Sequence, residues 1–217
     1  MIFNRASSDG HPIKGVIHFA GLKSVSESID KPIEYWDVNL RGTIDLVNVM
    51  NKNNCHNIVF SSSASIYKYS NNPLNEQSII KPTTTYGATK LAVEEFLKNL
   101  FISAPDKWRI ANLRYFNPIG AYSSGEIGED PSGVPNNLFP LITQIASGKR
   151  NILKIYGNDW PTHDGTCVRD FIHVMDLAEG HLSALKYLFL NDPQVLNLNL
   201  GTGKGISVLE LVKTFER

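Results

Sequence analysis

The sequence predicts an α/β fold in which a doubly wound parallel sheet is followed by a smaller α/β lobe. Short apolar runs rich in Val, Ile and Phe alternate along the first half of the chain with longer amphipathic segments. Such alternation is typical of a parallel sheet whose strands are joined by right-handed helical crossovers. After Pro118, glycine and proline become frequent through Pro140, which indicates the loops of a second lobe. We therefore expect lobes at residues 1–117 and 118–217, with residues 168–190 packing back on the first lobe.

Three strands and two long helices are expected in the first lobe. Residues 16–19 and 57–60 are largely apolar runs, which suit strands buried on both faces, and residues 110–115 form the third strand. The helices are expected at residues 32–50 and 86–101, because apolar side chains gather there on one side of each segment. These side chains are Ile44, Leu46, Val47 and Met50 in the first helix, and Leu91, Phe96, Leu97 and Leu100 in the second.

The second lobe is expected to contain helices at residues 139–146 and 176–188 and strands at residues 152–156 and 168–173. A further strand-like run at residues 195–200 leads into Gly201, Gly203 and Gly205 and then into an apolar segment. A strand, a Gly-rich loop and a helix can hold a phosphate, but this spacing matches neither the dinucleotide fingerprint nor the P-loop. We therefore expect no cofactor role for these glycines.

Tyr86 and Lys90 are the first candidate catalytic residues. They lie four positions apart at the start of the second helix, so both side chains fall on one face. A free tyrosine has a pKa near ~10 and is a poor base at neutral pH. A fixed cation favours the phenolate and can lower that pKa. The pair alone is weak evidence, because an exposed tyrosine and a solvated lysine are common.

A serine cluster upstream makes the catalytic interpretation stronger. Ser61, Ser62, Ser63 and Ser65 follow the strand at residues 57–60. In open α/β sheets the binding site lies beyond the carboxyl ends of the strands, which is where these serines fall. A serine there can hydrogen-bond a substrate oxygen while a tyrosine handles its proton. The alternative is a polar turn that satisfies its own backbone groups.

Further motifs follow in a specific order: VIHFAGLK at 16–23, FSSSASIY at 60–67, LRYFNPIGA at 113–121, GEDP at 128–131, VPNNL at 134–138 and DGTCVRDFIHVMDLA at 164–178. Together these residues resemble the extended, sugar-nucleotide-modifying branch of the short-chain dehydrogenase/reductase superfamily, and within it the UDP-glucose 4-epimerase (UDP-galactose 4-epimerase) family. The resemblance runs from about Gly15 to the last residue. It implies a partial Rossmann-like sheet and epimerisation at C4 of UDP-glucose and UDP-galactose in galactose metabolism, with NAD as cofactor.

The resemblance also implies roles for the catalytic residues. Tyr86, as phenolate, would take the proton of the sugar 4-hydroxyl while C4 gives its hydride to NAD. The 4-keto sugar would then turn over and take the hydride back on its other face. Lys90 would bind the nicotinamide ribose and lower the pKa of Tyr86, and Ser63 would hydrogen-bond the 4-oxygen.

Other positions are implied by their place in the family's motifs. The cofactor contacts are Phe19, Ala20, Gly21, Leu22, Lys23, Asn39 or its neighbour Val38, Ser61, Ser62, Ser63, Tyr86, Lys90 and Phe116. The substrate contacts are Lys23, Ser63, Tyr86, Asn117, Asn137, Leu138, the strand Lys154, Ile155 and Tyr156 beside the uracil, and Arg169. Arg169 suits the diphosphate because its guanidinium can meet phosphate oxygens in bidentate fashion; the alternative is a salt bridge with Asp170 or another acid.

The chain departs from this family at both ends. Residues 1–11 are polar and lack the strand and Gly-rich turn that hold the dinucleotide pyrophosphate. The chain also stops at Arg217, before the family's C-terminal region. We therefore expect an internal piece of an epimerase that lacks the first βαβ unit, and a homodimer in the complete enzyme.

Two other functions stay open. The first is a related sugar-nucleotide enzyme of the same superfamily, such as a dehydratase or decarboxylase. A dehydratase is disfavoured, because that class places an Asp-Glu pair where this chain has Ser62-Ser63-Ala64-Ser65. A catalytically silent fragment that acts only as a binding or subunit module is supported by the missing phosphate loop.

Composition narrows the remaining classes. Lys plus Arg and Asp plus Glu each total 21, so the net charge of zero argues against a nucleic-acid or anionic-membrane surface. No apolar run approaches the ~20 residues of a membrane span, and a cytoplasmic location is expected because the two cysteines suit free thiols in a reducing cytosol. Cys55 and Cys167 form no metal-spacing motif, and free thiols are expected. His18 and His173 lie in strand-like runs without ligand-spaced partners, so no metal is expected.

Overall fold

The protein is described by a computed structural model at residues 2–131, 135 and 137–217, and it divides into two compact units. The first unit comprises the residues up to Tyr115 together with Glu179–Asn199. The second unit comprises Phe116–Ala178 and Leu200–Arg217. Of the segment expected to return to the first lobe, residues 179–190 belong to the first unit and residues 168–178 to the second.

A sheet of strand order β1-β2-β3-β6 forms the centre of the first unit. The strands are β1 (Val16–His18), β2 (Asn57–Ser63), β3 (Arg109–Tyr115) and β6 (Gln194–Leu200). Both the β1–β2 and the β2–β3 pairs are parallel, which confirms the predicted parallel sheet. β2 is longer than the expected run at 57–60, because the backbone of Ser61, Ser62 and Ser63 continues the ladder with β3 as far as Tyr115.

Six α-helices lie wholly or partly in the described part of the first unit. They are α1 (Ile2–Ser8), α2 (Val25–Asp30), α3 (Pro32–Trp36), α4 (Gly42–Lys52), α5 (Thr85–Ser103) and the second half of α7 (Val174–Leu190). The long helix expected at residues 32–50 is observed as α3, a π-helical turn at Asp37–Arg41, and α4. α1 occupies a segment in which the sequence predicted no strand.

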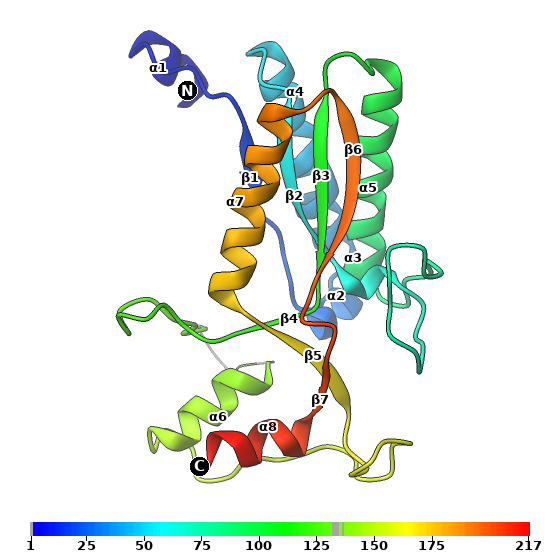
Figure 1. Ribbon diagram of the computed structural model, residues 1–217, viewed down its shortest axis with the longest axis vertical. Coiled ribbons are helices and arrows are strands. Elements are labelled where there is room, and N and C mark those ends of the chain that lie inside the picture. The colour runs from blue at the N-terminus through cyan, green and yellow to red at the C-terminus, as the bar shows by residue number, and fades with distance from the viewer. Residues whose placement is uncertain (1, 132–134, 136) are drawn as a thin grey trace. The chain divides into compact units, whose positions relative to one another are not determined.

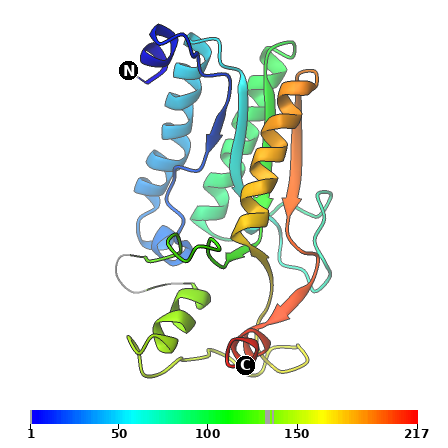
Figure 2. The same ribbon diagram turned by 60° about the vertical axis from the view of Figure 1, so that its left-hand side comes forward.

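Helices cover both faces of this sheet, as Figures 1 and 2 show for α4 and α5 on one side and α7 on the other. Because alternate strand residues point to opposite faces, the side chains confirm this arrangement. The core between the sheet and the two helices on one face is formed by Val47 and Met50 of α4, Ile58 and Phe60 of β2, Val93 and Leu97 of α5, and Trp108 and Ile110. On the other face, His181 of α7 contacts the ring of Tyr115 at 5.5 Å between centroids.

The second unit contains a three-stranded sheet of order β4-β5-β7. Its elements are β4 (Asn117–Ile119), α6 (Leu138–Ala146), β5 (Val168–His173), the first part of α7, β7 (Gly205–Ser207) and α8 (Val208–Phe215). β4 and β5 are parallel, whereas β5 and β7 are antiparallel. Ile142, Phe171 and Leu211 form the centre of its core.

The strand predicted at residues 152–156 is wrong. This segment is coil, and Ile152 and Tyr156 are 73% and 83% exposed. A short apolar run becomes a strand only where a neighbouring strand pairs with its backbone, and no described strand does so here. Among the described residues, no helix is long and apolar enough to cross a bilayer.

Candidate functional site

Ser63, Tyr86 and Lys90 come together where β2 ends beside the first turns of α5. The side chain of Thr84 caps this helix by accepting a hydrogen bond of 3.1 Å from the backbone N–H of Gly87. The Ser63 hydroxyl lies close enough to Tyr86 to act on the pKa of its hydroxyl, and it is hydrogen-bonded to the hydroxyl of Ser65 at 2.6 Å. Lys90 donates from Nζ to the carbonyl oxygen of Ser61 at 2.8 Å, and Nζ lies 5.8 Å from the centre of the Tyr86 ring. The structure therefore joins the three residues that the sequence singled out.

Gly87 allows the helix to begin this close to the end of β2. A Cβ atom at this position would lie 2.6 Å from the carbonyl oxygen of Ser65, which no side chain could accept without a backbone shift. The glycine between Tyr86 and Lys90 is thus part of the geometry that places both of them at the serine cluster.

Burial shifts the pKa values of Tyr86 and Lys90 in opposite directions. Burial raises the pKa of Tyr86, and the hydrogen bond from Ser63 opposes that rise. Burial also lowers the pKa of Lys90 from 10.5 to about 8. The expected lowering of the Tyr86 pKa by Lys90 is therefore not what the structure shows, because the ammonium bonds the Ser61 carbonyl and desolvation of the phenolate dominates.

Two other serines of the cluster, Ser61 and Ser62, are also engaged within the chain. The hydroxyl of Ser61 is hydrogen-bonded to that of Tyr115, whose pKa burial raises to about 12. Ser62 is fully buried and donates from Oγ to Oε1 of Glu94 at 2.5 Å. Contacts of these two hydroxyls with a cofactor stay predictions, because in this structure both hydroxyls bond side chains of the chain itself.

The loop after β1 is fixed by the buried side chain of Asn39. Its Oδ1 accepts from the backbone N–H of Leu22 at 2.7 Å, and its Nδ2 donates to the carbonyl oxygen of Leu22 and to Oγ1 of Thr89 on α5. Asn39 is 3% exposed, whereas its neighbour Val38 is 40% exposed. The buried side chain of Asn39 therefore fixes the loop backbone through hydrogen bonds, whereas the side chain of Val38 is exposed to solvent.

The same loop offers an exposed backbone surface beside a buried cation. Phe19 is 57% exposed and its ring lies 4.6 Å from that of His181, while Ala20, Gly21 and Lys23 are exposed. Gly21 has φ of +154°, and a Cβ there would lie 2.9 Å from Oδ1 of Asn39 and 3.8 Å from Nζ of Lys90. Close backbone approach and a positively charged donor fit the nicotinamide-ribose end of NAD.

The predicted substrate residues of the second unit fall into separate groups. Nδ2 of Asn117 donates to the carbonyl oxygen of Asp170 at 3.2 Å, and the exposed Arg169 donates to the carbonyl oxygen of Val168 at 3.3 Å. The alternative salt bridge of Arg169 with Asp170 is not found, since the Asp170 carboxylate is bound elsewhere. The backbone N–H of Phe116 donates to the carbonyl oxygen of Leu200 at 3.2 Å.

Asn137 and Leu138 begin α6, as its N-cap residue and first residue. Nδ2 of Asn137 donates to Oε1 of Glu129 at 3.2 Å, and Leu138 packs against the core of the second unit. Val134 and Asn136 of the same motif lie outside the described residues. Lys154, Ile155 and Tyr156 are exposed coil rather than a strand, and their contact with uracil stays a prediction.

The Gly-rich loop after β6 already holds a carboxylate. Oδ1 of Asp170 accepts from the backbone N–H and the hydroxyl of Thr202, and Oδ2 accepts from the backbone N–H of Gly203 at 2.8 Å. Because these donors bind an acid of the same chain, the loop is an internal clamp. This agrees with the expectation that Gly201, Gly203 and Gly205 do not hold a cofactor phosphate.

Sequence reasoning missed the buried ion pair between Glu94 and Arg114, in which the atoms approach to 2.6 Å. Its signal was available, because Glu94 continues the four-residue spacing of Tyr86 and Lys90. His18, expected to be structural, is buried and hydrogen-bonded to Oγ1 of Thr43, and burial lowers its pKa to about 4. Among the described residues, no group of His, Cys, Asp or Glu could hold a metal ion, and both cysteines are free.

Known proteins provide independent comparisons. A family model described as "NAD dependent epimerase/dehydratase family" matches residues 4–199. UDP-glucose 4-epimerase 2 of Oryza sativa subsp. japonica is 52% identical over 204 residues, which are 93% of this chain and 50% of that protein. UDP-glucose 4-epimerase of Bacillus subtilis (strain 168) is 52% identical over 206 residues, which are 94% of this chain and 60% of that protein. The chain thus spans 50% and 60% of the length of these two relatives.

A solved structure matches almost the whole chain. The UDP-glucose-4-epimerase from Stenotrophomonas maltophila, crystallised with bound NAD and formylated UDP-arabinopyranose, gives a TM-score of 0.92 at 46% identity. The match covers 99% of this chain and 64% of that chain. This similarity confirms the predicted α/β, Rossmann-like fold.

Proposed function

Because this chain belongs to the NAD dependent epimerase/dehydratase family, we propose that it carries the catalytic residues of a UDP-glucose 4-epimerase. The observation that carries the proposal is the convergence of Ser63, Tyr86 and Lys90 at the end of β2. NAD, when bound, supplies the acceptor that takes the hydride from C4 of the sugar and returns it. The residues of the chain supply the proton transfer and the positioning.

Tyr86 is the proposed base. As phenolate, its oxygen takes the proton from the 4-hydroxyl of the sugar and gives it back to the 4-oxygen after the 4-keto sugar has turned. Ser63, which lies beside Tyr86, holds the 4-oxygen during this exchange. Lys90, with a pKa of about 8, is mostly protonated at pH 7 and keeps a positive charge near the ring of Tyr86.

The cofactor is proposed to lie along the exposed backbone of residues 19–23. Lys90 supplies the donor for the nicotinamide ribose, and Gly21 lets the backbone approach closely. Phe19 and Val38 are exposed and offer apolar contact. Phe116 of the second unit remains a proposed neighbour of the nicotinamide from the family's motif alone.

UDP-glucose and UDP-galactose are the proposed substrates, as the names of the relatives suggest. In the second unit, the exposed guanidinium of Arg169 is the proposed partner of the diphosphate, and Asn117, Asn137 and Leu138 are further proposed contacts. In the first unit, Lys23 is the proposed contact from the loop after β1.

A dehydratase is a poorer candidate. That reaction needs an ionisable acid beside the catalytic serine. The carboxylate that contacts the serine cluster here is that of Glu94, which accepts a hydrogen bond from Ser62. Both oxygens of Glu94 are bound by Arg114 and the residue is 4% exposed. A carboxylate committed in this way has no free position for substrate chemistry.

The complete enzyme is proposed to be a cytoplasmic homodimer. The outer sides of α3 and α4 support an interface, since Ile33, Trp36 and Val49 are 84%, 40% and 43% exposed. Multi-angle light scattering on the purified chain checks this proposal, and a monomer at all concentrations would contradict it for this chain.

The test of function is conversion of UDP-galactose to UDP-glucose by the purified chain with NAD, followed by chromatography of the sugar nucleotides. Tyr86→Phe is expected to lower the rate by about 10²-fold or more, whereas Tyr69→Phe, at an exposed position, leaves it unchanged. Equal rates for Tyr86→Phe and the parent chain would refute the assignment of the base. A folded chain that neither converts substrate nor binds NAD in calorimetry would instead be the silent binding module.

A further inference from the structure

Tyr86 and Lys90 are two members of a longer stripe on α5. Glu94 is four residues beyond Lys90, so the three side chains follow one another along one side of the helix. All three face the end of β2: Tyr86 lies beside the Ser63 hydroxyl, Lys90 donates to the Ser61 carbonyl, and Glu94 accepts from the Ser62 hydroxyl. The helix therefore meets three consecutive residues of the strand.

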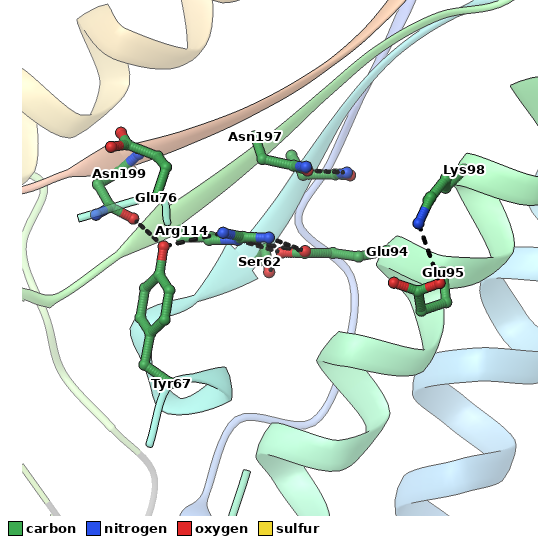
Figure 3. Close-up of polar contacts among 10 residues, drawn as sticks. Ser62, Tyr67, Glu76, Glu94, Glu95, Lys98, Arg114, Asn197 and Asn199 are labelled. Atoms are coloured by element: carbon green, nitrogen blue, oxygen red, sulfur yellow. Dashed lines mark hydrogen bonds and ion pairs between the residues drawn. The ribbon is translucent and has the colours of Figure 1, made fainter. Parts of the chain in front are cut away.

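The Glu94 contact is the only one of the three that is anchored by an ion pair in the described structure (Figure 3). Arg114 donates from Nε to Oε1 and Oε2 at 3.0 and 3.2 Å and from Nη2 to Oε2 at 2.6 Å. Arg114 is also the β3 partner of Ser62 in the strand register. Glu94 is thus held by two neighbouring strands at once.

The far side of Arg114 is fixed as well. Its Nη1 donates to the Tyr67 hydroxyl at 2.9 Å, and Tyr67 donates to Oδ1 of Asn199 at 2.7 Å, as the dashed lines in Figure 3 show. Arg114 is 2% exposed and Ser62 is fully buried. The guanidinium therefore has a single orientation available, and so has the carboxylate that it binds.

We propose that Glu94 and Arg114 are positioning residues, whose buried pair holds the end of β2 against α5 and so keeps Ser63 and the Ser61 carbonyl in place for Tyr86 and Lys90. That this placement serves catalysis rests on the proposed function. That the pair fixes the surroundings of Lys90 can be tested on the chain without substrate. The pair has no access to a substrate, since both residues are almost completely buried.

Stability alone does not account for such a pair. Removing both charges from the interior and replacing them with well-packed apolar side chains is often neutral or stabilising. What an apolar pair cannot supply is the directed hydrogen bond to Ser62, which fixes one strand residue relative to one helix residue. The double variant Glu94→Met/Arg114→Met therefore separates positioning from stability.

The test follows the titration of Lys90 in the purified chain, by NMR of lysine labelled with ¹³C at Cε. The Lys90 signal is assigned by its loss in Lys90→Met. The titratable groups that face Lys90 are Tyr86 on α5 and His18 on β1, and both stay in place. The matched control is Glu95→Met/Lys98→Met, which removes an exposed pair of 3.8 Å from the same helix.

In the parent chain and the control, Lys90 is expected to titrate at about 8, because burial lowers its pKa. In Glu94→Met/Arg114→Met, we expect a shift upward toward the ordinary 10.5, since Lys90 gains access to water once the end of β2 is no longer held. Ser62→Ala, which removes only the hydroxyl, is expected to shift it in the same direction. Circular dichroism confirms that each variant is folded.

The proposal is overturned if Lys90 still titrates at about 8, or lower, in the folded double variant and in Ser62→Ala. More apolar surroundings alone would lower the pKa of Lys90 further, so a purely structural pair predicts the opposite sign. If the double variant does not fold, Ser62→Ala decides alone, because it leaves the ion pair intact. The readout requires neither NAD nor activity, so failure of the proposed function would leave this result unaffected.

Discussion

Replacing Lys90 with methionine is expected to stabilise the first unit at neutral pH, although Lys90 is a proposed catalytic residue. The side chain is 4% exposed and its pKa falls from 10.5 to about 8 because burial disfavours the charged form. At pH 7 the folded chain must therefore keep a charge that the unfolded chain carries at no such penalty. Methionine fills similar space without a charge.

The magnitude follows from the shift in pKa. A difference of about 2.5 units at roughly 1.36 kcal/mol per unit amounts to about 3 kcal/mol of lost stability below pH 8. Removing Lys90 also removes the hydrogen bond to the Ser61 carbonyl, which subtracts about 1 kcal/mol. Lys90→Met should therefore raise the free energy of unfolding by about 2 kcal/mol at pH 7.

The stability difference between Lys90→Met and the parent chain depends on pH. Since the folded pKa of Lys90 lies below the unfolded one, the unfolded chain binds more protons between pH 8 and 10.5, and the parent chain gains stability as the pH rises through this window. Lys90→Met lacks that gain, so the difference between the two proteins should shrink from about 2 kcal/mol at pH 7 and vanish or reverse by pH 10.

Urea unfolding measures this difference. Trp108 is buried in the core of the first unit, and fluorescence in a Trp36→Phe/Trp160→Phe background reports on it alone. With a slope of about 2 kcal/mol per molar urea, the midpoint should rise by about 1 M at pH 7. Lys98→Met, at an exposed position on the same helix, should change stability by less than about 0.5 kcal/mol. A lower midpoint for Lys90→Met, or an unchanged pH dependence, would show that burial of the Lys90 charge does not destabilise the folded chain.

Three further substitutions have expected outcomes. Gly21→Ala should lose about 1–3 kcal/mol in urea unfolding, because φ of +154° strains alanine and its Cβ would meet Oδ1 of Asn39 at 2.9 Å; an unchanged midpoint would contradict this. Arg114→Met should lose about 3–5 kcal/mol by leaving Glu94 buried and unpaired, while the double variant with Glu94→Met recovers most of the loss; equal losses would argue against the ion pair. Asp170→Ala should speed amide hydrogen exchange at Thr202 and Gly203, whose N–H groups it binds, and unaltered exchange would show that the loop does not depend on it.

Much of the fold follows from local patterns. The apolar runs that became β1, β2 and β3 are buried between helices on both faces, which is the environment that such runs predict. The apolar stripe predicted for α5 also packs against this core, because an amphipathic helix buries its apolar side. Residues 152–156 show the opposite case, because the sequence carries an apolar run but cannot say whether another strand lies beside it.

In the candidate site, too, the sequence predicted some features and not others. The spacing of Tyr86 and Lys90 and the serines after a strand predicted which residues meet, because both features depend on regular secondary structure. The protonation of Tyr86 depends on burial and on the Ser63 hydrogen bond, and neither can be obtained from spacing. The contacts of Ser62 with Glu94 and of Asn39 with Leu22 and Thr89 join distant segments, so no local pattern could have shown that these polar side chains are already engaged.

The most direct measurement of the role of Tyr86 follows an isotope at C4 of the sugar. The chain is incubated with NAD and UDP-galactose that carries deuterium at C4, and the product is analysed by mass spectrometry. If Tyr86 moves only the hydroxyl proton while the hydride of C4 leaves and returns, the UDP-glucose formed keeps its deuterium, and Tyr86→Phe forms almost none. Product that has exchanged its deuterium with water, or equal product from Tyr86→Phe, would contradict this role of Tyr86.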